Sequence, residues 1–154
     1  MLRGNVLAVC RSLHRGKPKE PIGVGFFREG WGLIGDAHAG TAKEVSLLLK
    51  SQVEILARKT GMFFPPGAFA ENLLVNGILQ EDLVLPRCLR IGSVIFEITK
   101  IGKDPDEAHS YNYCGYSLLP RFGVFARVQR SGWVVVGDEI ELFEGESNEF
   151  GDEA

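Results

Sequence analysis

The sequence predicts a single, mostly β domain with a few helices, in which short antiparallel strands form a barrel or a folded sheet. Three observations predict this class. The apolar runs are short, and many of the 19 glycines fall between them, where a chain of short strands must turn. Only one segment has clear helical periodicity. At 154 residues with 45% hydrophobic residues, the chain can bury one core of ordinary size.

The first half of the chain contains four apolar segments that favour strands. G-N-V-L-A-V-C-R-S-L predicts the first strand, and residues 21–40 contain two shorter extended segments interrupted by glycines. E-V-S-L-L-L predicts a further apolar strand that leads directly into a helix.

The helix is the clearest element. Ser51 and Glu54 have the spacing of an N-terminal capping box, and Gly61 follows at the expected end. Val53 and Leu56 fall on one face. We therefore expect a helix of about ten residues packed outside the sheet.

The second half returns to strands. A Pro/Gly turn at F-F-P-P-G precedes an apolar stretch, and Val94, Phe96 and Ile98 alternate as in a half-buried strand. G-V-F-A-R-V-Q-R-S-G-W-V-V-V-G-D-E-I-E-L predicts two strands around an S-G turn. No repeat or linker divides the chain, so we expect residues 1–144 to form one domain.

Charge is distributed unevenly along the chain. Residues 138–154 carry eight Asp or Glu and no Lys or Arg, so the rest of the chain is net +5 when the total is −3. Residues 145–154 have almost no apolar side chains, and we expect a disordered acidic tail. The basic body suits a small anionic ligand, and it lacks the Lys/Arg stripe with interleaved aromatics of a nucleic-acid surface.

Cysteine usage indicates a reducing compartment, and hydropathy indicates a protein without a membrane helix. Cys10, Cys88 and Cys114 are odd in number and form no C-x-x-C pair. No apolar run approaches the ~20 residues of a membrane helix, and the first residues do not resemble a secretory signal. We expect a soluble cytoplasmic protein without a membrane partner.

Four polar clusters interrupt the apolar pattern next to expected strands. They are G-D-A-H-A-G at 35–40, A-F-A-E-N-L at 68–73, G-K-D at 102–104, and the loop that holds Cys114 and leads to Arg121 and Arg127. Polar residues at the strand ends of one barrel converge on one mouth, so these clusters predict a ligand pocket.

Each polar side chain has two interpretations. His38 is either a turn histidine bonded to Asp36 or a residue that faces an anionic ligand. Glu71 and Asn72 either begin a turn or helix, or orient other site residues through hydrogen bonds. Arg127 lies in an apolar strand, where a charge needs a phosphate or carboxylate partner, unless it is a solvated surface charge.

The clusters, in this order, resemble the MOSC family, the domain found at the C-terminus of molybdenum cofactor sulfurases and in amidoxime-reducing proteins. The similarity runs from about Trp31 to Ile140. The matching stretches are G-L-I-G-D-A-H-A-G, E-V-S-L-L, P-P-G-A-F-A-E-N-L with N-G-I, I-T-K-I-G-K, and G-V-F-A-R-V followed by V-G-D-E-I.

The resemblance implies a MOSC-type β-barrel whose pocket holds a molybdenum pterin cofactor. It also implies that Asp36, His38, Glu71 and Asn72 belong to the cofactor site. A family cysteine would carry sulfur or ligate the metal, for which a thiolate is a suitable soft ligand. The cofactor phosphate would need cationic partners, which Lys103, Arg121 and Arg127 could supply.

The chain departs from the family at this cysteine. Relatives often place it three residues before the proline of the P-x-x-G-V-F-A segment, and this chain has Ser117 there. Cys114 lies three residues earlier. Either the loop brings Cys114 into the catalytic and metal-binding role, or the thiol function is lost.

Three functions follow as hypotheses. The first is a standalone carrier or sulfur-transfer module for molybdenum cofactor, whose partners would be a separate sulfur donor or a molybdoenzyme. The second is a molybdenum-dependent reductase of N-hydroxylated compounds that takes electrons from a separate redox partner. The third is an interaction domain without cofactor.

Overall fold

The computed structural model describes residues 3–102 and 111–145. Lys103 and the acidic residues 146–154 lie outside the described residues. The elements, in chain order, are β1 Arg3–Arg11, β2 Glu20–Pro21, β3 Val24–Arg28, β4 Gly32–Leu33, β5 Val45–Leu49, α1 Lys50–Thr60, β6 Leu73–Asn76, the 3-10 turn η1 Gln80–Asp82, β7 Arg87–Ile91, β8 Val94–Ile101, α2 Leu119–Phe122, β9 Val124–Arg130, β10 Gly132–Val135 and β11 Glu139–Glu144.

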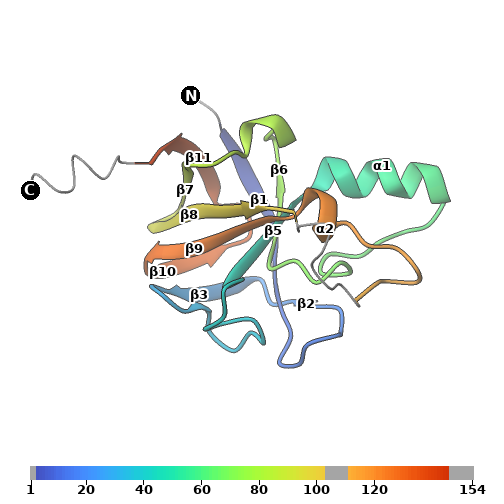
Figure 1. Cartoon of the computed structure of the whole chain (residues 1–154), viewed down its shortest axis with the longest axis horizontal. Helices are drawn as coiled ribbons and strands as arrows, with labels where there is room; N and C mark the ends of the chain where they lie inside the picture. The colour runs from blue at the N-terminus through green and yellow to red at the C-terminus, as the bar shows by residue number, and fades with distance from the viewer. Residues whose placement is uncertain (1–2, 103–110, 146–154) are drawn as a thin grey trace, which may run out of the picture.

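Seven of these strands close into a barrel, which confirms the predicted fold class. Their order is β11-β7-β8-β9-β5-β6-β1, and β1 pairs back to β11. All pairings around the barrel are antiparallel except β5 with β6. The short β2 extends β1, and β10, β3 and β4 form a separate small sheet. Helices α1 and α2 lie at one end of the barrel, on the right of Figure 1.

Two apolar clusters explain the continuous apolar run of β5. Leu47 and Leu49 point into the cluster that fills the barrel. Leu48 points the other way, into a second cluster that also contains Val53 of α1 and Phe69. A strand covered on both faces needs apolar residues at every position, as in buried sheets generally.

Helix α1 confirms the predicted segment but begins differently. It starts at Lys50, directly after β5, and Leu49 at its N-cap makes no side-chain hydrogen bond. Ser51 is therefore already inside the helix, and the expected capping box is absent. The C-terminal expectation holds: Gly61 has φ 72° and donates its N–H to the carbonyl of Ala57.

The two strands predicted around the S-G turn are confirmed, but they join different sheets. β9 and β10 flank Ser131, but β9 pairs with β5 and β8, whereas β10 pairs with β3 of the small sheet. The turn is thus a corner between two sheets. Gly132 fits this corner because an added Cβ would come within 2.5 Å of Ser93 Oγ.

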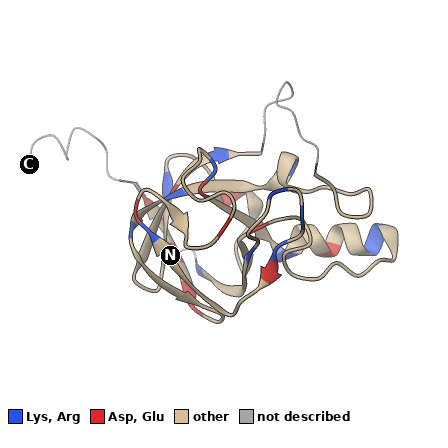
Figure 2. Ribbon diagram, turned by 90° about the horizontal axis from the view of Figure 1, so that it is seen from below, with Lys and Arg blue, Asp and Glu red and all other residues tan. Residues whose placement is uncertain are grey.

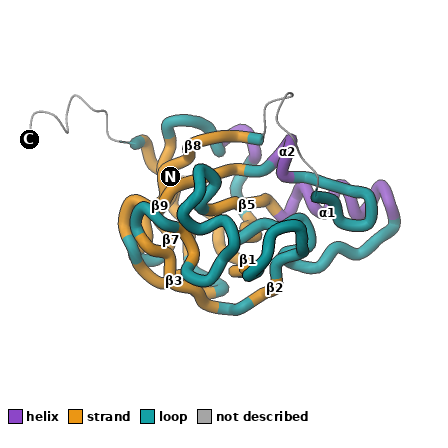
Figure 3. The backbone as a smooth tube through the Cα atoms, turned by 60° about the horizontal axis from the view of Figure 1, so that its bottom comes forward, coloured by secondary structure: helices purple, strands orange, loops and turns teal. Residues whose placement is uncertain are grey.

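Loop segments crowd one end of the molecule. Figure 3 shows them around β1 and β2, with α1 and α2 alongside. Among the described residues, no helix is both long enough and apolar enough to cross a membrane. The loops at this end carry most of the predicted site residues.

Candidate functional site

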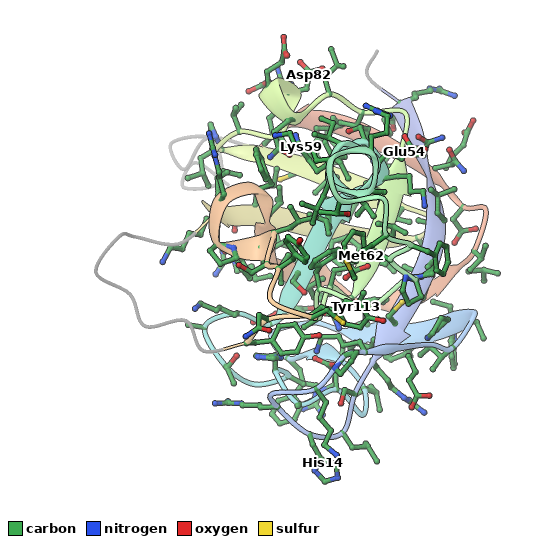
Figure 4. The ribbon with its side chains drawn as sticks, turned by 90° about the vertical axis from the view of Figure 1, so that its right-hand side faces the viewer. His14, Glu54, Lys59, Met62, Asp82 and Tyr113 are labelled. Carbon is green, nitrogen blue, oxygen red and sulfur yellow. The ribbon has the colours of Figure 1, made fainter. Side chains whose placement is uncertain are left out.

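A pocket of about 200 Å³ opens among these loops. Its walls come from the loop between β1 and β2, the loops that precede β5 and β6, Tyr111, and the buried faces of α2 and β9. Figure 4 looks at this end of the barrel, with His14 at the bottom and Tyr113 above it. The lining residues are His14, Arg15, Gly16, Lys17, Lys19, His38, Lys43, Ser46, Phe69, Ala70, Tyr111, Leu119 and Phe125.

The lining combines basic and aromatic side chains. Arg15, Lys17, Lys19 and Lys43 supply the positive charge, and no Asp or Glu is among the lining residues within the described ranges 3–102 and 111–145. The aromatic wall consists of Phe69, Tyr111 and Phe125, and Lys43 Nζ lies 5.7 Å from the centroid of the Phe125 ring. Figure 2 shows Lys and Arg recurring along the loops beside α1. Such a pocket is suited to an anionic group attached to a flat, partly apolar body.

A buried ion pair anchors the basic loop. Lys19 Nζ lies 2.7 Å from Asp36 Oδ1, and the two side chains are 2% and 0% exposed. The same Asp36 oxygen accepts the backbone N–H of Ser12 at 3.2 Å. Asp36 therefore binds both ends of residues 12–19 and holds this loop over the pocket.

His38 lies beside this ion pair and also lines the pocket. Its backbone N–H donates to Asp36 Oδ2 at 3.1 Å. Its ring Nδ1 is 3.2 Å from Lys19 Nζ and 3.9 Å from Asp36 Oδ2. His38 is thus bonded to Asp36 in a turn, as one interpretation predicts, and it also lines the pocket. The anionic ligand of the other interpretation stays a prediction.

Glu71 is buried beneath the pocket. Its carboxylate accepts the N–H groups of Gly67 and Phe69 at 2.8 and 3.1 Å and so shapes the turn that carries the aromatic wall. Burial raises the pKa of Glu71 to about 7, against the lowering effect of these hydrogen bonds. Burial, together with the nearby Glu71, raises the pKa of the Cys10 thiol to about 12.

Asn72 joins two barrel strands just before β6. Its Oδ1 accepts the N–H of Ser46 in β5 at 2.9 Å, and its Nδ2 donates to the carbonyl of Cys10 in β1 at 3.1 Å. The side chain is buried and does not line the pocket. In this structure Asn72 orients the strand that carries Ser46, which does line the pocket.

Cys114 sits at the tip of a tight turn. Tyr113 and Tyr116 exchange backbone hydrogen bonds of 2.7 and 2.9 Å around it. Cys114 and Gly115 have φ values of 52° and 91°, the pattern of a type I′ turn. Cys114 is exposed, whereas Cys10 and Cys88 are buried.

Aromatic contacts fix this turn beside the pocket. Tyr113 packs edge-on against Phe69, a pocket residue, with the ring centroids 6.2 Å apart. Tyr111 donates its hydroxyl hydrogen to the carbonyl of Ala68. Burial raises the pKa of Tyr111 to about 12, with smaller contributions from Glu71, Tyr113 and Cys114. Cys114 is thus next to the aromatic wall, although it does not line the pocket.

The remaining predicted residues lie apart from the pocket lining. Ser117 is exposed just before α2, and Arg121 lies over the ring of Phe122 on the outer side of that helix. Arg127 is exposed on β9, and its Nε donates to Glu97 Oε1 at 2.6 Å. The carboxylate partner expected for Arg127 is therefore a cross-strand neighbour on β8.

Sequence reasoning missed the basic loop between β1 and β2. Five basic residues fall in the nine positions of R-S-L-H-R-G-K-P-K, residues 11–19. This density of basic residues was the signal in the sequence that could have identified the loop as part of an anion-binding site. Lys43 and Tyr111 were missed as well, because each is one polar residue in a loop and only the fold brings it to the pocket.

The family model described as the MOSC domain matches residues 35–141. This stretch is well over half of the chain. The chain belongs to the MOSC domain family. The resemblance found in the sequence motifs is thereby confirmed. Among the described residues of this MOSC domain, no three His, Cys, Asp or Glu side chains lie close enough to hold a metal ion by themselves.

Solved structures share the fold of this MOSC domain. The YUAD protein from Bacillus subtilis is 17% identical, with a TM-score of 0.73 over 94% of this chain and 97% of its own. YiiM from Escherichia coli is 19% identical, with a TM-score of 0.66 over 96% and 72%. YiiM from Geobacillus stearothermophilus is 16% identical, with a TM-score of 0.62 over 92% and 73%. No curated protein matches the chain significantly.

Proposed function

We propose that this MOSC domain binds molybdenum cofactor at the loop end of the barrel and acts as a carrier or sulfur-transfer module. The observation that carries the proposal is the pocket itself, whose described lining residues include several cations and an aromatic wall. MOSC domains are associated with this cofactor in general. The cofactor joins a flat pterin to an anionic phosphate, and both chemistries have partners here.

The size of the pocket indicates which part of the cofactor it would hold. About 200 Å³ is below the roughly 300–1,000 Å³ of typical ligand pockets, so it suits one end of the cofactor. A shallower hollow of about 670 Å³ lies across the same loop and shares His14 and Lys17 with the pocket. Arg15, Lys17 and Lys43 would hold the phosphate, and the rest of the cofactor would extend over the loop.

Cys114 would supply the thiol of this module. Its turn packs on the aromatic wall, and its side chain is exposed, as sulfur transfer to another protein requires. A thiolate from Cys114 is also what a molybdenum-dependent reductase would need as a metal ligand. The exposed thiol therefore favours this reductase as the second candidate.

The experiment measures molybdenum and pterin bound to protein purified from a host that makes the cofactor. We expect both to be retained by the wild type and strongly reduced in a Lys17→Glu and in a Lys43→Glu variant, with Arg90→Glu on the far barrel wall as the charge-matched control for each. Absence of molybdenum and pterin from the wild type would overturn the proposal. The remaining hypothesis would then be an interaction domain without cofactor.

A second pair of variants separates the roles of position 114. Cys114→Asn removes the thiol but keeps the turn, because Asn-Gly is the preferred pair at type I′ turns. Retained pterin with lost molybdenum or lost sulfur transfer would assign the thiol to Cys114. Unchanged metal in Cys114→Asn with increased metal in Ser117→Cys would instead show that the thiol function is lost from this chain.

A further inference from the structure

Two structural facts place His38 between a buried charge and the pocket. Lys19 and Asp36 form an ion pair with side chains 2% and 0% exposed. His38 touches this pair through Nδ1, while its side chain is 32% exposed and lines the pocket. The proposed function gives His38 no defined part.

The hydrogen bond between Lys19 and His38 decides where the imidazole proton lies. A lysine ammonium carries three donors and no acceptor. Its Nζ lies 3.2 Å from Nδ1, so Nδ1 accepts this hydrogen bond and carries no proton. The neutral ring then has its proton on Nε2.

Asp36 does not compete for the ring in this arrangement. Its Oδ2 is 3.9 Å from Nδ1, beyond hydrogen-bond distance, and it accepts the backbone N–H of His38 instead. Its Oδ1 accepts from Lys19 and from the N–H of Ser12. Lys19, and not Asp36, is therefore the member of the ion pair that is hydrogen-bonded to Nδ1.

We propose that Lys19 is a positioning residue that holds His38 as the Nε2–H tautomer, so that His38 donates a hydrogen bond to an oxyanion in the pocket. Nδ1 contacts the ion pair and the His38 side chain lines the pocket, so we assign Nε2, on the other edge of the ring, to the pocket. A donor at this place selects a ligand oxygen and disfavours a ligand N–H. The phosphate or another oxyanion of the ligand is therefore expected beside His38, Arg15 and Lys17.

This inference rests on the proposed function only for the choice of ligand. The tautomer can be measured on the protein without any cofactor, by long-range ¹H–¹⁵N NMR of the imidazole nitrogens. The chain has three histidines, and a His38→Gln variant assigns the signals. We expect Nδ1 of His38 to resonate as an unprotonated nitrogen and Nε2 as a protonated one.

The variants test whether Lys19 is the cause. In Lys19→Met the carboxylate of Asp36 stays 3.9 Å from Nδ1 and attracts a proton there, so the tautomer is expected to change to Nδ1–H. Lys19→Arg retains a donor that cannot accept and should keep Nε2–H. A folded Lys19→Met protein with an unchanged spectrum would overturn the proposal, as would Nδ1–H in the wild type.

Lys19→Met leaves Asp36 buried without its partner and can prevent folding. The wild type then supplies a second measurement, the coupling across the hydrogen bond between Lys19 Nζ and His38 Nδ1. Its presence supports the assignment, and its absence contradicts it.

The predicted hydrogen bond from His38 to an oxyanion is tested by NMR. Inorganic phosphate is added until the ammonium signal of Lys17 or Lys43 shifts. A shift of the His38 Nε2–H signal over the same range is the expected result. An unshifted His38 signal, or no response from either lysine, would overturn the oxyanion assignment. Failure of the cofactor proposal would appear separately, as absent molybdenum and pterin beside an unchanged tautomer.

Discussion

Lys19 Nζ and Asp36 Oδ1 lie 2.7 Å apart in an ion pair that water does not reach. The pair joins the basic loop to the turn that carries His38, and it fixes Lys19 in the lining of the pocket, together with Arg15 and Lys17 of the same loop. The position of the loop that carries the proposed ligand contacts therefore depends on this ion pair.

Asp36→Ala is expected to destabilise the protein by about 3–5 kcal/mol, because it leaves the Lys19 charge buried and unpaired. Urea unfolding followed by fluorescence would measure the loss. Arg90→Gln removes one partner of the exposed Arg90–Glu141 pair and should cost less than about 1 kcal/mol. Equal small losses in both variants would mean that Lys19 reaches solvent when Asp36 is absent.

Asn72→Ala is expected to cost about 2–4 kcal/mol, since it orphans the buried N–H of Ser46 and the carbonyl of Cys10. Asn76→Ala, on the exposed end of the same strand, should change the unfolding free energy by no more than ~0.5 kcal/mol. Denaturant unfolding compares the two variants. A near-neutral Asn72→Ala would contradict the strand-joining role.

The pKa of Glu71 predicts a pH dependence of stability. Folding raises this pKa from 4.5 to about 7, so the folded state binds more protons than the unfolded state between these values. The unfolding free energy contributed by Glu71 should therefore fall as pH rises from about 4.5 to 7, by on the order of 1–3 kcal/mol.

The difference in unfolding free energy between wild type and Glu71→Gln isolates this effect, because other titrating groups are common to both proteins. Glutamine does not ionise, so the advantage of the wild type should shrink across that pH window. A difference that is constant with pH would show that Glu71 keeps an ordinary pKa.

Thiol accessibility should separate the three cysteines. A thiol reagent is expected to modify Cys114 in the folded protein and to reach Cys10 and Cys88 only on unfolding, since those two are buried. Absorbance titration gives the count, and Cys114→Asn should leave no fast-reacting thiol. A second fast thiol would indicate local opening of the barrel wall.

Much of the fold could be predicted because its signals are local. The apolar run of β5 and the positive φ of Gly61 follow from neighbouring residues. The start of α1 could not, because Leu49 becomes the N-cap through burial in the barrel and not through a capping side chain. The corner at Ser131 likewise depends on which sheet β10 joins.

The candidate site could be predicted only where residues lie at strand ends. Asp36 and His38 meet as neighbours in one turn, and the sequence indicates that contact directly. The pairing of Arg127 with Glu97 depends on the register of β8 against β9, which shifts at two irregular positions. Lys19 looks like an ordinary solvated lysine until the loop folds over Asp36.

The turn at Cys114 and Gly115 is held from outside, by backbone bonds between its flanking tyrosines and by their rings against Phe64 and Phe69. The side chain of Cys114, at the tip, takes part neither in these hydrogen bonds nor in these ring contacts. Evolution can thus exchange the side chain at position 114 in one step while the barrel and the aromatic wall stay intact. A thiol at position 114 is therefore a replaceable group, because its loss leaves both supports of the turn in place.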